Sequence, residues 1–229
     1  KAEETCGVEL TLKENEAYRA EEMSILKDRY NISDEEALKI QKFVAKHAYK
    51  ETDRRTYQAM EAFIHNLNTM HSRAGAQVPF SSVNFGTDIT EEGRMVIKNL
   101  LLATEAGLGN GETPIFPILI FKVKAGVNYN DGDPNYDLFK IACRVSAKRL
   151  FPNFGFIDAP FNSQYYVPGR PETEAVYMGC RTRVIGNVYD KSREVVTGRG
   201  NISFSSINLP RLGIKYGQAT NGTADIHGF

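Results

Sequence analysis

The first 70 residues carry apolar positions at helical spacing. Ser33 to Glu36 has the sequence of a capping box, which predicts that a helix begins there. The residues that follow on one face of this helix are Ile40, Phe43, Val44 and His47. The charged run from Glu51 to Arg55 predicts a break, and a second helix is expected from about Thr56 into the low 70s. The chain is therefore predicted to consist of a helical segment over residues 1–50 and a larger part over residues 51–229.

From residue 75 onward the pattern changes to strands alternating with helices. Asp88 or Thr90 can cap a helix that continues to about Leu108, and Asp133 followed by Pro134 predicts the start of another that ends near residue 149. The glycines at 107, 109 and 111 predict a turn after a helix; a phosphate cradle is the less favoured alternative. Strands are expected at residues 77–85, 115–123, 153–157, 164–167 and 202–209. The apolar run at 115–123 is typical of a parallel strand buried on both faces, so the predicted fold class is α/β.

Charge and composition exclude several classes of function. The chain has 229 residues, with 28 Lys and Arg against 28 Asp and Glu. A neutral chain lacks the basic surface of a protein that binds nucleic acid directly, and no apolar run has the roughly 18 to 20 residues of a membrane span. Three cysteines and no secretory signal pattern favour a reducing, cytoplasmic setting. The first residue is not Met, so we expect the sequence to be a piece of a longer protein.

Two local clusters could carry chemistry. Cys180 lies in YMGCRTRVIG beside Arg181 and Arg183, and guanidinium groups can favour a thiolate or bind an anionic substrate. The alternative is an ordinary structural cysteine. Asn201 and Asn208 lie at the two ends of the last predicted strand, where their carboxamides could bind a polar ligand or could simply close turns.

Several long blocks resemble the catalytic chain of anaerobic ribonucleoside-triphosphate reductases. They span roughly residues 49 to 214 and occupy positions 65–88, 92–124, 133–154, 171–190 and 198–214. The resemblance implies a ten-stranded α/β barrel, built from two half-barrels around a finger loop, of which this chain is a part. The barrel is preceded here by the helical segment.

The resemblance also implies the reaction, in which ribonucleoside triphosphates are reduced by thiyl-radical chemistry under anaerobic conditions. Cys180 in MGCR matches the finger-loop cysteine that becomes the thiyl radical and takes the 3′-hydrogen of the substrate. Asn201 is similar to the asparagine beside the substrate in members that use formate, with Asn208 as the alternative match. The residues expected to bind substrate are Ser72, Ser81, Arg181 and Asn208.

The cofactors that the resemblance implies are expected outside this chain. They are a glycyl radical, installed by an S-adenosylmethionine-dependent iron–sulfur activase, and a four-cysteine zinc site. Expected partners are the ribonucleoside triphosphate, deoxynucleotide or ATP effectors, the radical-activating enzyme and a second copy in a homodimer of the full-length enzyme. We expect the isolated chain to be inactive and, because a part of a barrel exposes strand edges, to associate.

Two other interpretations stay open. The chain could be a non-catalytic remnant of the same fold that binds nucleotides or another subunit. A formate-lyase-like enzyme is less favoured, because its finger loop would carry paired cysteines where this chain has Gly179, Cys180 and Arg181.

Overall fold

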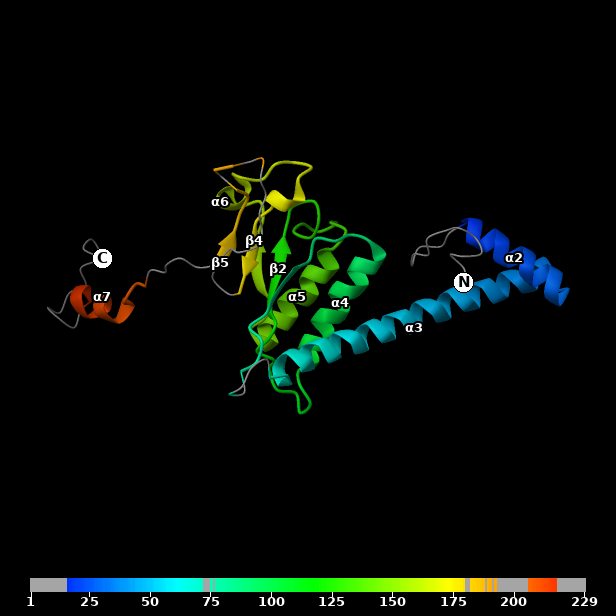
Figure 1. Ribbon diagram of the computed structural model, residues 1–229, viewed down its shortest axis with the longest axis horizontal. Helices are drawn as coiled ribbons and strands as arrows, with labels where there is room; N and C mark the ends of the chain where they lie inside the picture. Colours follow the sequence, from blue (N-terminus) through cyan, green and yellow to red (C-terminus); the bar gives the residue numbers. More distant parts are fainter. Residues whose placement is uncertain are drawn as a thin grey trace. The chain divides into compact units, whose positions relative to one another are not determined.

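A computed structural model describes residues 16–71, 75, 77–179, 182–187, 189–190, 192 and 206–217. The chain divides into two compact units, Lys1–Val195 and Val196–Phe229, and each is described by itself. Within the described residues, the first unit contains two amino-terminal helices, a parallel sheet with its crossover helices, and a hairpin with short helical turns before it (Figure 1). The second contains the helix α7 (Leu209–Tyr216).

The amino-terminal part consists of the helices α2 (Glu16–Tyr30) and α3 (Asp34–Thr69). The predicted capping box is confirmed: the Ser33 amide donates to Glu36 Oε2 at 3.0 Å, and the Glu36 amide donates to Ser33 Oγ at 3.4 Å. The predicted break at Glu51 to Arg55 is wrong, because α3 continues through it. Glu51 accepts hydrogen bonds from Arg54 and Arg55 at 2.6 and 2.9 Å, which lowers the pKa of its carboxyl to about 2. These spacings of three and four residues stabilise a helix, so the charged run forms one of its solvated faces.

The sheet confirms the predicted α/β class. Its strands are β1 (Ser82–Phe85), β2 (Ile118–Val123) and β3 (Asn153–Phe156), which pair in parallel in the order β1-β2-β3. The helices that connect them are α4 (Glu91–Ala106) and α5 (Tyr136–Arg149). In the register, Ser82 pairs with Ile118 and Ile120 pairs with Asn153. All six residues of β2 are buried, as its apolar run predicts, whereas β1 begins five residues later than expected.

The hydrophobic core lies between one face of this sheet and the helices. Leu119 of β2 packs with Ile64 of α3 and with residues of α4, and Phe121 of β2 packs with α4 and α5. Phe121 is fully buried and meets Phe85 edge to face, with ring centroids 5.5 Å apart. Burial of side chains of this size contributes about 1.5–3 kcal/mol each. The sheet is therefore held firmly from its helical side, and the contacts on its other face are described below.

The ends of α4 follow the predicted signals. Thr90 is the N-cap, and its hydroxyl accepts from the Gly93 amide at 3.1 Å. Gly107 ends the helix with a φ of 85°, a conformation that favours glycine. The Gly111 amide then donates to the Leu108 carbonyl at 2.6 Å. Because this amide is used within the turn, the interpretation as a helix-ending turn is confirmed over the phosphate cradle.

The start of α5 differs from the prediction. The helix begins at Tyr136 after Asn135, two residues beyond the expected cap at Asp133. The Asp133 carboxylate instead accepts from the amides of Tyr129 and Asn130, at 3.0 and 2.8 Å, and so closes the preceding loop. The predicted cap is therefore wrong: the Asp133 side chain stabilises the loop before the helix.

The chain after β3 folds into short elements that the sequence pattern did not predict. They are α6 (Pro160–Ser163), the 3₁₀ helix η1 (Pro171–Thr173), and the antiparallel strands β4 (Val176–Met178) and β5 (Thr182–Val184). The strand expected at 164–167 is wrong, since Val167 makes only an isolated bridge to Arg170. Of the strand expected at 202–209, positions 202–205 lie outside the described residues, and Leu209 opens α7.

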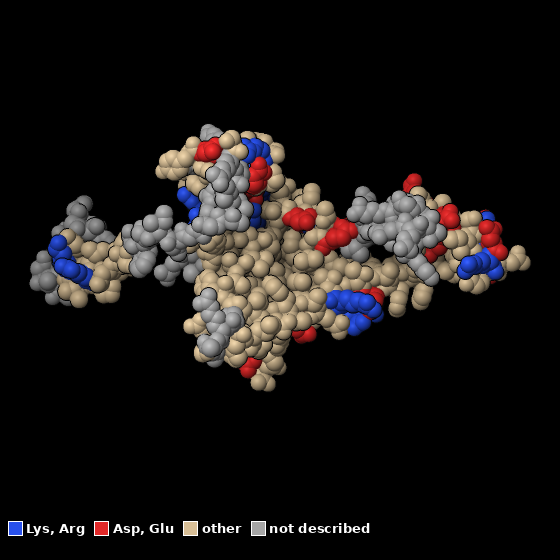
Figure 2. All heavy atoms as spheres, viewed as in Figure 1, with Lys and Arg blue, Asp and Glu red and all other residues tan. Residues whose placement is uncertain are grey.

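The described surface carries charges of both signs. In Figure 2, acidic and basic side chains lie near one another, and uncharged residues cover much of the centre of this face. Within the described ranges, no helix is both long and apolar enough to cross a bilayer.

Candidate functional site

The face of the sheet opposite the helices is partly polar. Val83 and Phe85 pack into the core, so the alternating residues of β1, Ser82 and Asn84, point the other way. The register carries this pattern across the sheet to Lys122 of β2 and Gly155 of β3. We call these four residues, Ser82, Asn84, Lys122 and Gly155, the polar face. Figure 1 shows α4 and α5 on one side of β2 and the β4–β5 hairpin on the other.

Hydrogen bonds from β1 hold the hairpin against the polar face. The Asn84 carboxamide makes two bonds to one residue of β4: its Nδ2 donates to the Tyr177 carbonyl at 2.7 Å, and its Oδ1 accepts from the Tyr177 amide at 2.9 Å. Two positions further along, the Gly179 amide donates to Ser82 Oγ at 3.1 Å. The side chains of β1 thus bind the backbone of β4 and of the residue that follows it.

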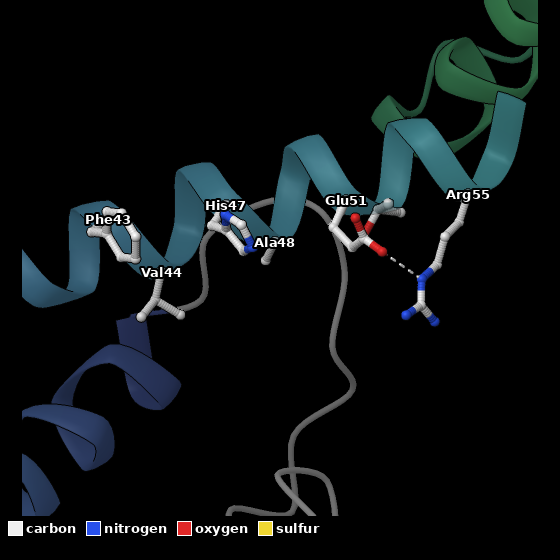
Figure 3. A pocket seen from close by; sticks show the side chains of 7 residues that line it. Phe43, Val44, His47, Ala48, Glu51 and Arg55 are labelled. Carbon is white, nitrogen blue, oxygen red and sulfur yellow. Dashed lines mark hydrogen bonds and ion pairs between the residues drawn. The ribbon is translucent and has the colours of Figure 1, made fainter.

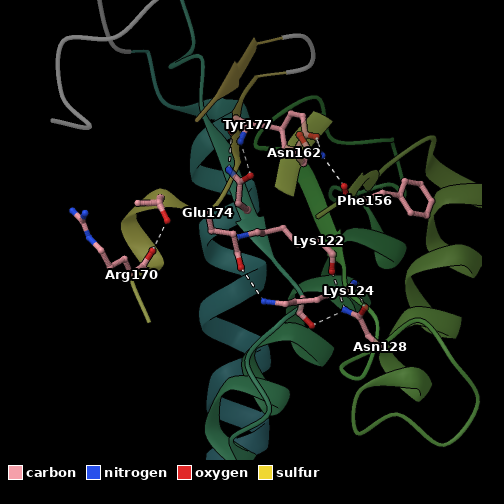
Figure 4. A network of polar contacts seen from close by, with 11 residues as sticks. Lys122, Lys124, Asn128, Phe156, Asn162, Arg170, Glu174 and Tyr177 are labelled. Atoms are coloured by element: carbon pink, nitrogen blue, oxygen red, sulfur yellow. Dashed lines mark hydrogen bonds and ion pairs between the residues drawn. The ribbon is translucent and has the colours of Figure 1, made fainter. Parts of the chain in front are cut away.

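The Tyr177 side chain extends this contact to β3. A Cβ atom at Gly155 would lie 2.8 Å from the Tyr177 ring, so the strand needs glycine where the ring crosses it. The phenol oxygen accepts from Asn162 Nδ2 at 2.8 Å, and the same nitrogen donates to the Phe156 carbonyl at 2.6 Å (Figure 4). Tyr177 is therefore fixed at its backbone by β1 and at its ring by β3 and α6.

A cluster of three charges joins β2 to the segment before β4 (Figure 4). Glu174 forms ion pairs with Lys122 and with Lys124, the second at 3.2 Å. Burial of Glu174 raises its pKa, but the hydrogen bonds and positive charges of the two lysines outweigh this effect, so the net pKa is lowered. The carboxylate is consequently ionised at neutral pH, and it neutralises a lysine on a buried strand.

The hairpin ends at a connection of three residues. Met178 pairs with Thr182, which leaves residues 179–181 between the strands. Gly179 has a φ of 61°, and a Cβ atom there would lie 2.9 Å from the Phe80 ring. Both the backbone conformation and the space thus favour glycine immediately before position 180.

Most of the predicted site residues cannot be placed. Ser72, Cys180, Arg181 and Asn201 lie outside the described residues. The shared site of Cys180 and Asn201 therefore stays a prediction.

Two predicted substrate-binding residues are described. Ser81, partly buried just before β1, donates from its hydroxyl to the Pro79 carbonyl at 3.3 Å. Asn208, in the second unit, is the N-cap of α7 and accepts from the Arg211 amide at 2.9 Å. Asn208 thus has a structural role, in keeping with the alternative that the two asparagines close turns. The substrate-binding roles of both residues stay predictions.

Sequence reasoning missed the residues that support the hairpin, chiefly Asn84, Tyr177 and Glu174. A signal for Asn84 was present, because SSVNF alternates polar and apolar residues in the manner of a strand with one polar face. Among the described residues, no three His, Cys, Asp or Glu side chains come close enough together to hold a metal ion.

A second candidate region is a shallow groove of about 360 Å³ along α3 (Figure 3). It is lined by Phe43, Val44, His47, Ala48, Glu51, Thr52 and Arg55. The Phe43 ring is stacked on His47 with centroids 5.9 Å apart, and Phe43 is 70% exposed. Glu51 is already engaged by two arginines, so the groove offers mainly apolar contact. The hairpin on the polar face is the better candidate for chemistry.

Comparison with known proteins identifies the family. The sequence model of the anaerobic ribonucleoside-triphosphate reductase family matches residues 34–225. The chain belongs to this family. Similar proteins named anaerobic ribonucleoside-triphosphate reductase occur in Haemophilus influenzae, 33% identical over 164 residues, and in Enterobacteria phage T4, 34% identical over 169 residues. The Escherichia coli protein of that name is 31% identical over 170 residues.

These matches cover much of this chain but little of each reductase. They include 71%, 73% and 74% of this chain for the Haemophilus, phage and Escherichia proteins, and 22%, 27% and 23% of those proteins. The chain thus spans about a quarter of the length of the reductases it matches. The predicted resemblance is confirmed, and the relatives are oxidoreductases by name.

Proposed function

We propose that this chain supplies the radical-bearing finger loop of an anaerobic ribonucleoside-triphosphate reductase. The three parallel strands would be part of the ten-stranded barrel, and the β4–β5 hairpin would be the finger. The observation that carries this proposal is the hairpin, because its two strands lie on either side of position 180 in a chain that belongs to the family. Asn84 and Ser82 bind the hairpin to the polar face, and Glu174, just before it, pairs with Lys122 of that face.

In the proposed reaction, Cys180 exchanges a hydrogen atom with the substrate. As a thiyl radical it would take the 3′-hydrogen of the ribose, forming an S–H bond and leaving a carbon radical on the sugar. The 2′-hydroxyl would then leave as water after it gains a proton. Two electrons and a proton, which replace the lost hydroxyl by a hydrogen on the 2′-carbon, must come from an external reductant, for which formate, oxidised to carbon dioxide, is the candidate. The S–H group would finally return its hydrogen to the 3′-carbon.

The other residues would bind and orient the nucleotide. Arg181 beside the thiol would pair with an anionic group of the substrate. The Ser72 hydroxyl would donate a hydrogen bond to it, and the Ser81 hydroxyl would do so on exchanging its present acceptor, the Pro79 carbonyl. Asn201 would bind near the 2′-position, with Asn208 as the alternative. Enclosure of the sugar by the barrel would keep water and oxygen from the radical intermediate.

The whole protein's partners are part of the same proposal. A glycyl radical, installed by an S-adenosylmethionine-dependent iron–sulfur activase, would supply the unpaired electron from outside this chain, where a zinc site is also expected. The substrate would be a ribonucleoside triphosphate, the effectors deoxynucleotides or ATP, and the assembly a homodimer in the cytoplasm.

The test is reduction of ribonucleoside triphosphates by the full-length protein, activated without oxygen by its radical-installing enzyme. Cys180→Ser should abolish formation of deoxynucleotides. Cys143→Ser is the matched control, because Cys143 is an exposed residue on α5 and partial desolvation of its thiol raises its pKa. It should keep at least half of the activity.

The outcomes separate the competing interpretations. Turnover that survives Cys180→Ser would contradict the assignment of the radical site. Binding of nucleotide without turnover by the activated full-length protein would favour the non-catalytic remnant.

A further inference from the structure

The Asn84 carboxamide binds both backbone groups of one residue in β4. Its nitrogen and oxygen contact the carbonyl and the amide of Tyr177 at 2.7 and 2.9 Å. We propose that Asn84 is a positioning residue that sets the place of the β4–β5 hairpin, up to Gly179, on the polar face. This inference rests on the proposed function, in which Cys180 is the reacting group.

The contacts form a short ladder between β1 and β4. Asn84 meets Tyr177 and Ser82 meets Gly179, so the two segments run antiparallel past each other with contacts two residues apart. A single hydrogen bond would allow β4 to swing about it. The paired bonds of one planar carboxamide fix both direction and distance, and the second contact at Ser82 lies next to the connection.

The base of this ladder is rigid. Asn84 pairs with Ile120 in the register of the parallel sheet, and its neighbours Val83 and Phe85 are packed into the core. The Asn84 side chain therefore transmits the position of the sheet to the hairpin. Transfer of a hydrogen atom from a sugar carbon to a sulfur depends on the positions of both atoms, because a displacement of about 1 Å can lower the rate on the order of a hundredfold.

The test compares Asn84→Ala and Asn84→Asp with Asn68→Ala in the activated full-length protein. Aspartate keeps the acceptor for the Tyr177 amide but turns an oxygen toward its carbonyl. Asn68 is a matched control, since its partly buried carboxamide also bridges two segments: its Oδ1 accepts from the Ile115 amide at 2.8 Å, and its Nδ2 donates to the Ile64 carbonyl at 2.7 Å.

We expect kcat to fall at least tenfold in both Asn84 variants, while the KM for the ribonucleoside triphosphate stays within twofold. Asn68→Ala should lose stability but keep its kcat at a temperature where it is folded. A kcat within twofold of wild type in Asn84→Ala would overturn the proposal, as would an equal loss in Asn68→Ala.

Amide hydrogen exchange tests the anchor without catalysis. Exchange at Tyr177 should accelerate at least tenfold in Asn84→Ala and stay unchanged in Asn68→Ala, with β2 and α4 equally protected in both. If Cys180→Ser proves active, the proposed function fails while faster exchange at Tyr177 still supports the anchor. Unchanged exchange at Tyr177 would refute the anchor whatever the activity. Should Asn84→Ala not fold, Ser82→Ala with exchange followed at Gly179 gives the same comparison.

Discussion

Replacement of Glu174 by glutamine would test how strongly the charge cluster on the polar face stabilises the fold. The side chains of Lys122 and Glu174 are only 11% and 15% exposed. Loss of one partner from a fully buried ion pair costs about 3–5 kcal/mol, because the other charge is left without compensation. Glutamine still accepts one hydrogen bond, and some water reaches the pair. We therefore expect Glu174→Gln to lower the free energy of unfolding by about 2–3 kcal/mol.

The matched control is Glu105→Gln. Glu105 pairs with Arg144 at 2.7 Å, but the arginine is 56% exposed, so the expected loss is below about 1 kcal/mol. Urea unfolding followed by circular dichroism measures both losses. The double variant Lys122→Met/Glu174→Leu should recover most of the stability, since an apolar pair needs no compensating charge. Equal losses of unfolding free energy for Glu174→Gln and Glu105→Gln would refute this reasoning. So would a loss in the double variant equal to the sum of the losses in Lys122→Met and Glu174→Leu alone.

The pH dependence of the same variant has a definite sign. The folded-state pKa of Glu174 is lowered below its ordinary value of 4.5. A carboxyl with a lowered folded-state pKa contributes its full stabilisation above the unfolded pKa and loses it as the pH falls through the folded pKa. The difference in urea midpoint between wild type and Glu174→Gln should therefore be constant from pH 7 to about 5.5 and shrink below about 4.5. A difference that grows on acidification would contradict the assignment.

Two further pairs of substitutions test the packing by urea midpoints. Ile64→Ala on α3 should cost about 2–4 kcal/mol, because Ile64 is 1% exposed, whereas Phe43→Ala on the same helix should cost less than about 0.5 kcal/mol. Similar losses for the two would show that the Phe43 face is covered in the folded protein. Gly107→Ala should cost at least about 1–3 kcal/mol, since φ is 85° and the new Cβ would lie 2.6 Å from the Glu112 carbonyl oxygen. Gly109→Ala, with open space around it, should stay within about 0.5 kcal/mol, and a larger loss there would discredit the comparison.

The regular α/β part of the fold was predictable from the sequence. Its signals are local: the capping box at Ser33, the cap at Thr90, the glycine that ends α4 and the uninterrupted apolar run of β2. Each of these depends on residues within a few positions of one another, so a single sequence contains the information. The parallel pairing follows from the helices that separate the strands.

The errors arose where local charge was given too much weight. The run from Glu51 to Arg55 predicted a break, although it contains neither glycine nor proline and its charges pair along the helix. Asp133 was expected to cap a helix but closes the loop before it. In both places the residue types were compatible with two local structures, and the packing of the surrounding chain decided between them.

The hairpin was missed for a different reason. β4 and β5 have three residues each, which is too short for a periodic pattern to stand out. Their positions depend on contacts with distant parts of the chain: Asn84 and Tyr177 are 93 residues apart, and Lys122 and Glu174 are 52 residues apart. A single sequence records both partners of such a contact but nothing that connects them.

Polar residues within otherwise apolar strands nevertheless indicate that another segment of the chain packs against them. Burial of a lysine on a strand that lies between two other strands costs free energy unless an opposite charge pairs with it. A carboxamide on a strand needs hydrogen-bond partners for both its oxygen and its nitrogen. Lys122 and Asn84 therefore imply that some other segment lies over their face of the sheet. The residue types even restrict that segment, because Lys122 requires an acidic side chain and Asn84 is suited to a free backbone amide and carbonyl. Only the folded chain reveals that one segment, from Glu174 to Gly179, satisfies both requirements and leads directly to position 180.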